Sequence, residues 1–161
     1  MNQNNYGQNR GGFSRSQGGG YNQPAKTITI PDFGDAEFLG KKAQELARDL
    51  AKDTGLTRGQ LRNFYGEVKN IEHILDAATD QNKNMKWAEV YPRVKLIRAK
   101  AVYNANRKQG IKIPDEYKQF LEKGIDKIGQ DYPAGFKTFK IFCQLFEAVV
   151  GYATEHAKEG K

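Results

Sequence analysis

Several kinds of chemistry are scarce or missing in this 161-residue sequence. Its single cysteine, Cys143, excludes a disulfide within the chain and fits a reducing compartment, so we expect a cytoplasmic protein. No apolar run approaches the ~20 residues of a membrane-spanning helix. The polar N-terminus lacks the apolar segment of a signal peptide. The sequence therefore predicts a protein that neither enters a membrane nor is exported.

Residues that build catalytic sites are also scarce. His73 and His156 fall on different predicted helices and lack partners at the spacing of metal ligands. GxxxxGK loops, which bind phosphate, and CxxC or HExxH metal motifs are absent. Cys143 adjoins an aromatic stripe and is predicted to be a small buried residue. Glu147, nearby, is predicted to pair with a basic residue of a neighbouring helix. We expect no enzyme, metal site or cofactor.

The chain divides into a polar leader and a helical domain. The leader consists largely of Asn, Gln, Gly and Ser and cannot bury enough apolar area to fold. Its RGGF motif at residues 10–13 resembles a single RGG-type repeat, which can contact RNA loosely, although one repeat favours a solubilising tail. The predicted segments are a disordered tail (1–26), an extended lead-in (27–34), a helical bundle domain (35–157) and a frayed C-terminus (158–161).

Apolar residues recur at helical spacing in five stretches and predict an all-α fold, a compact bundle of about five helices. Asp35 is predicted to cap the first helix. Pro92 is placed in the first turn of the third, where its missing N–H costs nothing. The expected helices span roughly 35–54, 57–78, 92–108, 114–129 and 133–156. Ile28 and Ile30 of the lead-in are expected to lie on the bundle.

Four of these helices have one inward stripe, and the third has two apolar faces. The expected stripes are Leu39, Ala43, Leu46, Ala47 and Leu50; Leu61, Phe64, Val68, Ile71 and Leu75; Tyr117, Phe120, Leu121, Ile125 and Ile128; and Phe139, Phe142, Phe146, Val149 and Ala153. The two faces of the third helix are Val94, Ile97, Ala101 and Ala105, and Leu96, Ala99 and Tyr103. A helix that is apolar on two sides is central in its bundle or meets a second subunit.

Residues 55–61 carry the clearest helix start in the chain. Gly55 can close the preceding helix in a left-handed conformation. Thr57 can cap the next helix, with Gln60 completing a capping box. Leu56 and Leu61 then occupy the positions of a hydrophobic staple. This well-anchored helix carries a basic, aromatic-edged stripe, which is typical of a surface that grips a phosphate backbone.

The formal net charge of +7 favours acidic partners, nucleic acid first. Each basic residue taken alone could equally belong to a solvated surface. The arginines, however, lie among Asn63, Tyr65 and Asn104, and a guanidinium group can bind phosphate through two hydrogen bonds. Such binding is expected to be salt-sensitive and largely independent of sequence. The candidate RNA-binding residues are Arg58, Arg62, Lys69, Arg93, Lys100, Arg107, Lys137 and Lys140.

Three motifs occur in the order found in a known family. They are LTRGQLRNFY at residues 56–65, then Leu96, Tyr103 and Arg107, then FKTFKIFCQLFEAVVGY at residues 136–152. Together they resemble the small subunit of the type III-A (Csm) CRISPR effector complex over roughly residues 36–156. The glycine-rich leader departs from the family pattern.

The resemblance implies a small non-catalytic α-helical subunit in an antiviral ribonucleoprotein. Several copies would stack beside the backbone subunits that carry the guide RNA, and basic residues would line the channel of the guide–target RNA duplex. RNA and DNA cleavage would belong to the backbone and large subunits. Arg58, Arg62 and Arg107 are carried over by motif match, whereas the other candidates rest on their helical positions alone. The implied partners are guide RNA, target RNA, the backbone and large subunits, and further copies of the chain.

Two other hypotheses remain open. The two apolar faces of the third helix also fit a helical adaptor that contacts proteins alone. A hydrolase would need an unrecognised site at His73, His156 or Glu147, and no catalytic constellation supports one.

Overall fold

The computed structural model describes residues 25–159 and has five helices in this range. The predicted tail and its RGGF motif lie outside the described residues, apart from Ala25 and Lys26. Within the described part there is no strand, and one isolated bridge joins Thr57 to Lys158. The helices are α1 (Lys41–Ala51), α2 (Arg58–Asp76), α3 (Lys83–Asn106), α4 (Asp115–Asp126) and α5 (Ala134–Ala153). The predicted all-α bundle of five helices is therefore confirmed.

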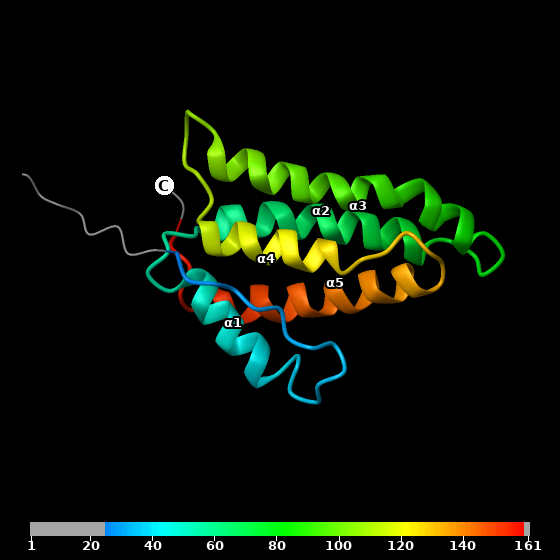
Figure 1. The fold of residues 1–161 in the computed structure, drawn as a ribbon, viewed down its shortest axis with the longest axis horizontal. Helices are drawn as coiled ribbons and strands as arrows, with labels where there is room; N and C mark the ends of the chain where they lie inside the picture. The colour runs from blue at the N-terminus through cyan, green and yellow to red at the C-terminus, as the bar shows by residue number, and fades with distance from the viewer. Residues whose placement is uncertain (1–24, 160–161) are drawn as a thin grey trace, which may run out of the picture.

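The helices pack in a closed ring around one core. In this ring α2 packs between α3 and α5, α4 packs on α3, and α1 packs on both α4 and α5. Figure 1 shows α3 along one long edge of the molecule, with α1 lying obliquely across the opposite edge. The outer side of α2 is therefore flanked by α3 and α5 and faces away from α1. None of the described helices has the length and apolar character needed to cross a membrane.

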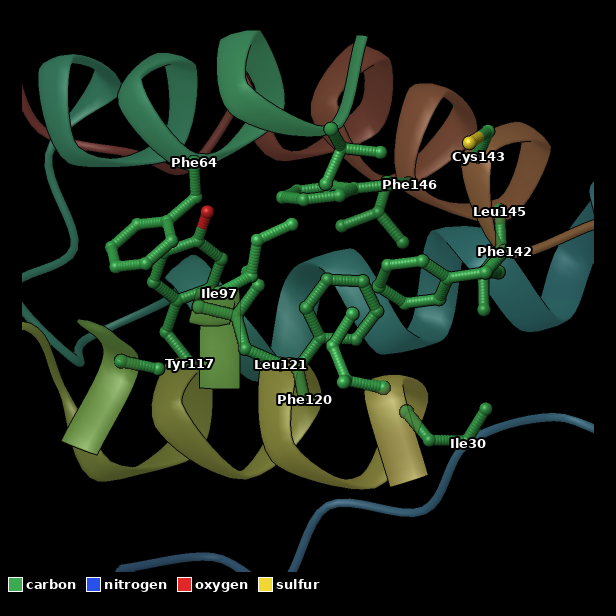
Figure 2. Packing of buried hydrophobic residues seen from close by; sticks show 14 of the residues in the cluster. Ile30, Phe64, Ile97, Tyr117, Phe120, Leu121, Phe142, Cys143, Leu145 and Phe146 are labelled. Atoms are coloured by element: carbon green, nitrogen blue, oxygen red, sulfur yellow. The ribbon is translucent and has the colours of Figure 1, made fainter. Parts of the chain in front are cut away.

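Aromatic rings from three helices fill the centre (Figure 2). Phe146 of α5 lies at the middle of this group, with its ring centroid 5.1 Å from Phe120 and 6.4 Å from Tyr117, both on α4. Tyr65 of α2 packs on the same ring from another side. Because these rings lock α2, α4 and α5 together, α2, which carries Arg58, Arg62 and Lys69, has a rigid support.

The residues of the four single stripes and of the first apolar face of α3 are buried with two exceptions, whereas Leu96, Ala99 and Tyr103 of its second face are exposed. Leu39 is 39% exposed, and Ala105 is half-buried at the end of α3. Ile28 and Ile30 of the lead-in are buried as predicted, and the Ile28 backbone N–H donates to the Gln119 side chain of α4. The apolar pattern thus predicted most of the core.

The start of the first helix was predicted wrongly. α1 begins at Lys41, and residues 33–40 form turns. The Asp35 carboxylate accepts a hydrogen bond from the Glu37 backbone N–H at 2.8 Å and pairs with Lys42, so it caps a local turn instead of the helix. Leu39 therefore precedes α1 and lies outside its inward stripe, and Phe38 is buried instead.

Pro92 lies inside α3, not in its first turn as predicted. The turns before it are held by Trp87 and Val90, which are both buried. The Trp87 indole N–H also donates to the Gln130 carbonyl at 2.8 Å. Burial of these two side chains outweighs the ~3 kcal/mol cost of an interior proline. Pro92 itself faces solvent, where water can satisfy the carbonyl that its ring leaves unpaired.

The predicted capping box at the start of α2 is confirmed. The Gln60 backbone N–H donates to Thr57 Oγ1 at 3.2 Å, and the Thr57 backbone N–H donates to Gln60 Oε1 at 3.1 Å. Leu56 and Leu61 are both buried, as the staple requires. Gly55 has a φ of +84°, but it lies in the connection after the α1 cap at Lys52 and does not itself close that helix.

The C-terminal segment is attached to α2 where we expected fraying. Ala157 is buried, the Lys158 backbone N–H donates to the Leu56 carbonyl, and the Lys158 carbonyl accepts from the Arg58 backbone N–H, both at 2.9 Å. The first N–H groups of any helix lack partners within the helix. Residues 157–159 supply one such partner to α2, and this contact holds the segment in place.

Two helix-interior glycines are expected to respond oppositely to alanine. A Cβ at Gly124 of α4 would lie 2.2 Å from the Phe142 ring, so Gly124→Ala should lower the free energy of unfolding by about 1–3 kcal/mol. A Cβ at Gly66 of α2 would meet nothing within 4 Å, so Gly66→Ala should raise it by about 0.5–1 kcal/mol. Urea denaturation of both variants measures the difference, and changes of the same sign would contradict this packing.

Candidate nucleic-acid interface

All the predicted RNA-binding side chains belong to α2 and its two neighbours, α3 and α5, or to the residue that caps α3. We call the surface formed by α2 and the adjoining sides of α3 and α5 the α2 wall. Contacts across the helices place Lys100, Arg93 and Lys140 on this wall, as described below. Lys137 lies one turn before Lys140 on α5 and therefore shares its side of the helix.

Carboxylates and lysines alternate along the contact between α2 and α5. Glu72, which is only 6% exposed, accepts hydrogen bonds from Lys69 at 2.5 Å and from Lys140 at 2.7 Å. Lys140 also bonds Asp76 at 2.8 Å, and Lys69 lies 3.6 Å from Glu147. The predicted pairing of Glu147 with a neighbouring helix is thus confirmed. Two of the candidate cations, Lys69 and Lys140, meet at one buried carboxylate.

These contacts shift the pKa values of the groups involved. Burial opposes the ionisation of Glu72, but hydrogen bonds from Lys140 and Lys69 outweigh it and lower the pKa of its carboxyl group. The hydrogen bond with Glu72 raises the pKa of Lys69 to about 12. All three groups therefore stay charged at neutral pH.

A shallow groove of about 280 Å³ runs between α2 and α3. Lys100 crosses it and bonds Glu67 of α2 at 2.7 Å. Arg93 and Leu96 line the groove from α3, and Asn70 lines it from α2. Arg93 is exposed and forms no ion pair with any described residue. The groove therefore brings together one neutralised cation and one that is available to an external anion.

Two of the arginines carried over by motif match hold parts of the chain together. Arg58 bonds Glu159 at 2.9 Å and the Thr154 carbonyl at 3.0 Å, which fixes the C-terminal segment on α2. Arg107, the C-cap of α3, donates to the Ile111 carbonyl within the loop that leads to α4. Both side chains are half-buried, and each keeps a buried Nε without a partner among the described residues.

The third arginine, Arg62, lies on the fully exposed stripe of α2. Its neighbours on this stripe are Asn63, Gly66, Asn70 and His73, all exposed and none acidic. Each carboxylate of α2 pairs with a lysine at one side of the stripe or the other: Glu67 with Lys100, Glu72 with Lys69 and Lys140, and Asp76 with Lys140. Within residues 25–159, Arg62, Arg93 and Lys137 form no ion pair. The wall thus presents uncompensated positive charge on all three helices, beside the paired cations Lys100 and Lys140.

The sequence indicated the cations of the wall but missed the acids that neutralise some of them. Glu72 was detectable in principle, since it follows Lys69 at a spacing of three residues, which favours a pair on one helix face. The contacts of Lys100 and Lys140 depend on how helices pack, and no local pattern gives them.

Arg62 and Lys137 lie toward opposite ends of the α2–α5 contact. Arg58 meets Glu159 at one end of this contact, and Lys140 meets Asp76 at the other.

The described part of the chain offers little support for a cysteine nucleophile or a metal-binding site. Cys143 is buried, as predicted, and burial raises the pKa of its thiol far above the usual value. A buried protonated thiol is a poor nucleophile. No group of three or more His, Cys, Asp or Glu side chains among residues 25–159 is arranged to hold a metal ion.

Glu72 makes the stability of the bundle dependent on pH. Its folded pKa lies below the ordinary value of 4.5, so its contribution is complete above that value and is lost as the pH falls through the folded pKa. Glu72→Gln should therefore lower the free energy of unfolding by about 1–3 kcal/mol at pH 7, since it removes charge-assisted hydrogen bonds. The difference from wild type should shrink in acid. Denaturation of both proteins across this pH range measures it, and a constant difference would contradict the assignment.

The fold and this surface together define a small helical protein with a basic, non-acidic outer stripe. The chain belongs to the Csm2 Type III-A family, whose model matches residues 34–159. Members of this family are small subunits of the type III-A Csm effector complex of CRISPR systems, in which they are structural components alongside other subunits. No curated protein and no solved structure matches the chain.

Proposed function

We propose that this chain is a non-catalytic RNA-binding subunit of a type III-A effector complex in antiviral defence, and that RNA lies along the α2 wall. The observation that carries the proposal is the distribution of charge on α2. Lysines pair with every carboxylate of this helix, while Arg62 of α2 and Arg93 of α3 face solvent without an acidic partner among the described residues. A polyanion therefore meets attraction on the wall without competing for an existing ion pair.

Along the wall, arginine and asparagine side chains provide contacts to phosphate and sugar groups. The guanidinium groups of Arg62 and Arg93 can each bind a phosphate through two hydrogen bonds, and Lys137 contributes charge. Asn63 and Asn70 add neutral donors between them. Such contacts position a strand without reading its bases, so the guide and target RNA would be held whatever their sequence.

In the complex, the chain would lie beside the guide-carrying backbone subunits. Several copies would stack in a row, so that successive α2 walls form a continuous basic surface along the guide–target RNA duplex. Cleavage would belong to other subunits. A cytoplasmic site of action agrees with the single buried cysteine, which needs no oxidising compartment.

The salt dependence of RNA binding tests this proposal in the purified full chain. If Arg62, Arg93 and Lys137 each neutralise one phosphate, the slope of log affinity against log salt should be about −2 for a single strand, at roughly −0.7 per contact. Fluorescence anisotropy with a labelled RNA at several salt concentrations measures the slope. An affinity that does not change with salt would contradict a phosphate-binding wall.

A second candidate function is supported by the outer face of α3. Met85 is 70% exposed and Tyr103 is 69% exposed, and Leu96 lies between them at helical spacing. A helical adaptor that contacts proteins alone would use such a face. In that case the chain would stay in the effector complex after ribonuclease treatment, and charge reversal on the α2 wall would leave both assembly and RNA content unchanged.

A further inference from the structure

One end of α3 carries an exposed aromatic ring beside unpaired cations. A hollow of about 490 Å³ is lined by Val102, Tyr103, Asn106, Arg107, Lys108 and Gln109. Tyr103 is 69% exposed, although a tyrosine ring usually finds cover in a folded protein. None of the residues that line the hollow is acidic, and neither Arg107 nor Lys108 pairs with a carboxylate in the described part of the chain.

The hollow has a rigid base because the α3–α4 loop is pinned at several points. Arg107 donates to the Ile111 carbonyl, and the Gln60 side chain donates to the Lys112 carbonyl at 2.9 Å. The Ile113 backbone N–H donates to the Asn104 carbonyl, and the Ile113 side chain is buried. Figure 1 shows this loop rising beyond the end of α3. The Arg107 guanidinium is thus held in place before any ligand arrives.

Gly110 permits the close fold of this loop. Its φ of +79° lies in the left-handed region, and a Cβ there would lie 3.2 Å from the Arg107 guanidinium. The guanidinium therefore lies against the glycine backbone instead of extending into solvent. On the helix surface, Tyr103 and Arg107 are four residues apart and share one face. Both side chains line the hollow, so a flat group on the Tyr103 ring would share the hollow with a cation.

From this arrangement we propose that Tyr103 stacks an unpaired base of single-stranded RNA, with its phosphate held by Arg107 and Lys108. Base faces stack on aromatic rings whatever their sequence, and cations beside the ring hold the backbone. Asn106 and Gln109 offer amide donors and acceptors to the edge of the base. The proposal rests on the RNA-binding function above and adds to it a preference for unpaired nucleotides at this end of the wall.

A protein partner is the competing occupant of this site, since the exposed face of α3 continues toward Leu96 and Met85. The charge of the hollow favours RNA. Lysine is depleted in the cores of protein interfaces, whereas Lys108 joins Arg107 in the lining of this hollow. An anionic ligand with a flat face satisfies both the ring and its cations.

The test compares Tyr103→Ala, Tyr103→Phe and Met85→Ala in the full chain. The probes are a labelled oligoadenosine of about 12 nucleotides and an RNA duplex of the same length. Tyr103→Ala should weaken single-strand binding by about 5-fold or more, because loss of a stacked base costs roughly 1–3 kcal/mol. Tyr103→Phe, which keeps a ring, and Met85→Ala, at the other end of the same helix face, should stay within twofold of wild type. Duplex binding should be unchanged in all three variants.

A direct readout comes from Tyr103→Trp. Wild type already fluoresces through the buried Trp87, so its signal is subtracted from that of the variant. The remaining fluorescence, from the new tryptophan, should be quenched by the single strand and not by the duplex. If wild type binds RNA and Tyr103→Ala binds each probe as tightly as wild type does, the stacking site is wrong while the proposed function stands. If wild type binds neither probe, both fail. A loss of self-association by sedimentation in Tyr103→Ala, with RNA binding intact, would overturn the stacking site and assign the face to protein.

Discussion

Reversing the charge of Arg62 and Arg93 together should lower the affinity of the chain for RNA roughly 100-fold. Each guanidinium can make charge-assisted hydrogen bonds worth about 1.5–3 kcal/mol, and 1.4 kcal/mol corresponds to a factor of ten. The double variant Arg62→Glu/Arg93→Glu should also make the salt dependence shallower by roughly 1.4 in log–log slope, since two phosphate contacts are lost. Neither side chain supports the fold through an ion pair with a described residue, so the free energy of unfolding should barely change.

The matched control is Lys41→Glu/Lys52→Glu. These lysines are exposed at the two ends of α1, away from the α2 wall, and their reversal changes the net charge by the same amount. In this control only the general electrostatic attraction weakens, so the affinity for RNA should fall by a few-fold at physiological salt. If the α1 control and the wall variant lose affinity equally, RNA binding depends on net charge alone and not on the wall.

Phe146→Ala should cost the bundle about 3–5 kcal/mol of unfolding free energy. The ring is completely buried and packs against Tyr65, Tyr117, Phe120 and Phe142, so its removal leaves a cavity among α2, α4 and α5. The surrounding rings cannot close this cavity without moving a helix. Urea denaturation gives the change directly, and the midpoint should fall while the slope stays near that of wild type.

Leu39→Ala is the informative comparison for Phe146→Ala. Sequence periodicity placed Leu39 in the core, whereas the structure places it before α1 with 39% of its surface exposed. Its replacement should therefore cost about 0.5 kcal/mol, in the range of surface substitutions. A decrease in unfolding free energy as large as that of Phe146→Ala would instead support the longer first helix that the sequence predicted.

The difference between Leu39 and the other core residues shows where sequence reasoning stops. Periodicity predicted the inward faces of α2, α4 and α5 because those helices have single, uninterrupted stripes. It failed at Asp35 because a short carboxylate can satisfy a local turn as easily as a helix cap. It failed at Pro92 because the cost of an interior proline was offset by burial of Trp87 and Val90, which is a tertiary effect.

The candidate site shows the same limit. Helical position was enough to collect the basic residues on three packed helices, and the motif match reached Arg62. Whether a cation is free or paired depends on side chains far away in sequence, such as Glu67 beside Lys100 and Asp76 beside Lys140. Arg58 carried a motif match and proved to bind the C-terminal segment. These partners became visible only when the packing of the helices was known.

Photo-cross-linking of RNA to the chain in the assembled effector complex, with the cross-linked peptides identified by mass spectrometry, tests the α2 wall most directly. We expect cross-links in α2 around Arg62 and in α3 from Arg93 to Arg107, and none in α1. Cross-links concentrated on α1 or on the outer side of α4, with α2 unmodified, would contradict RNA binding by this wall.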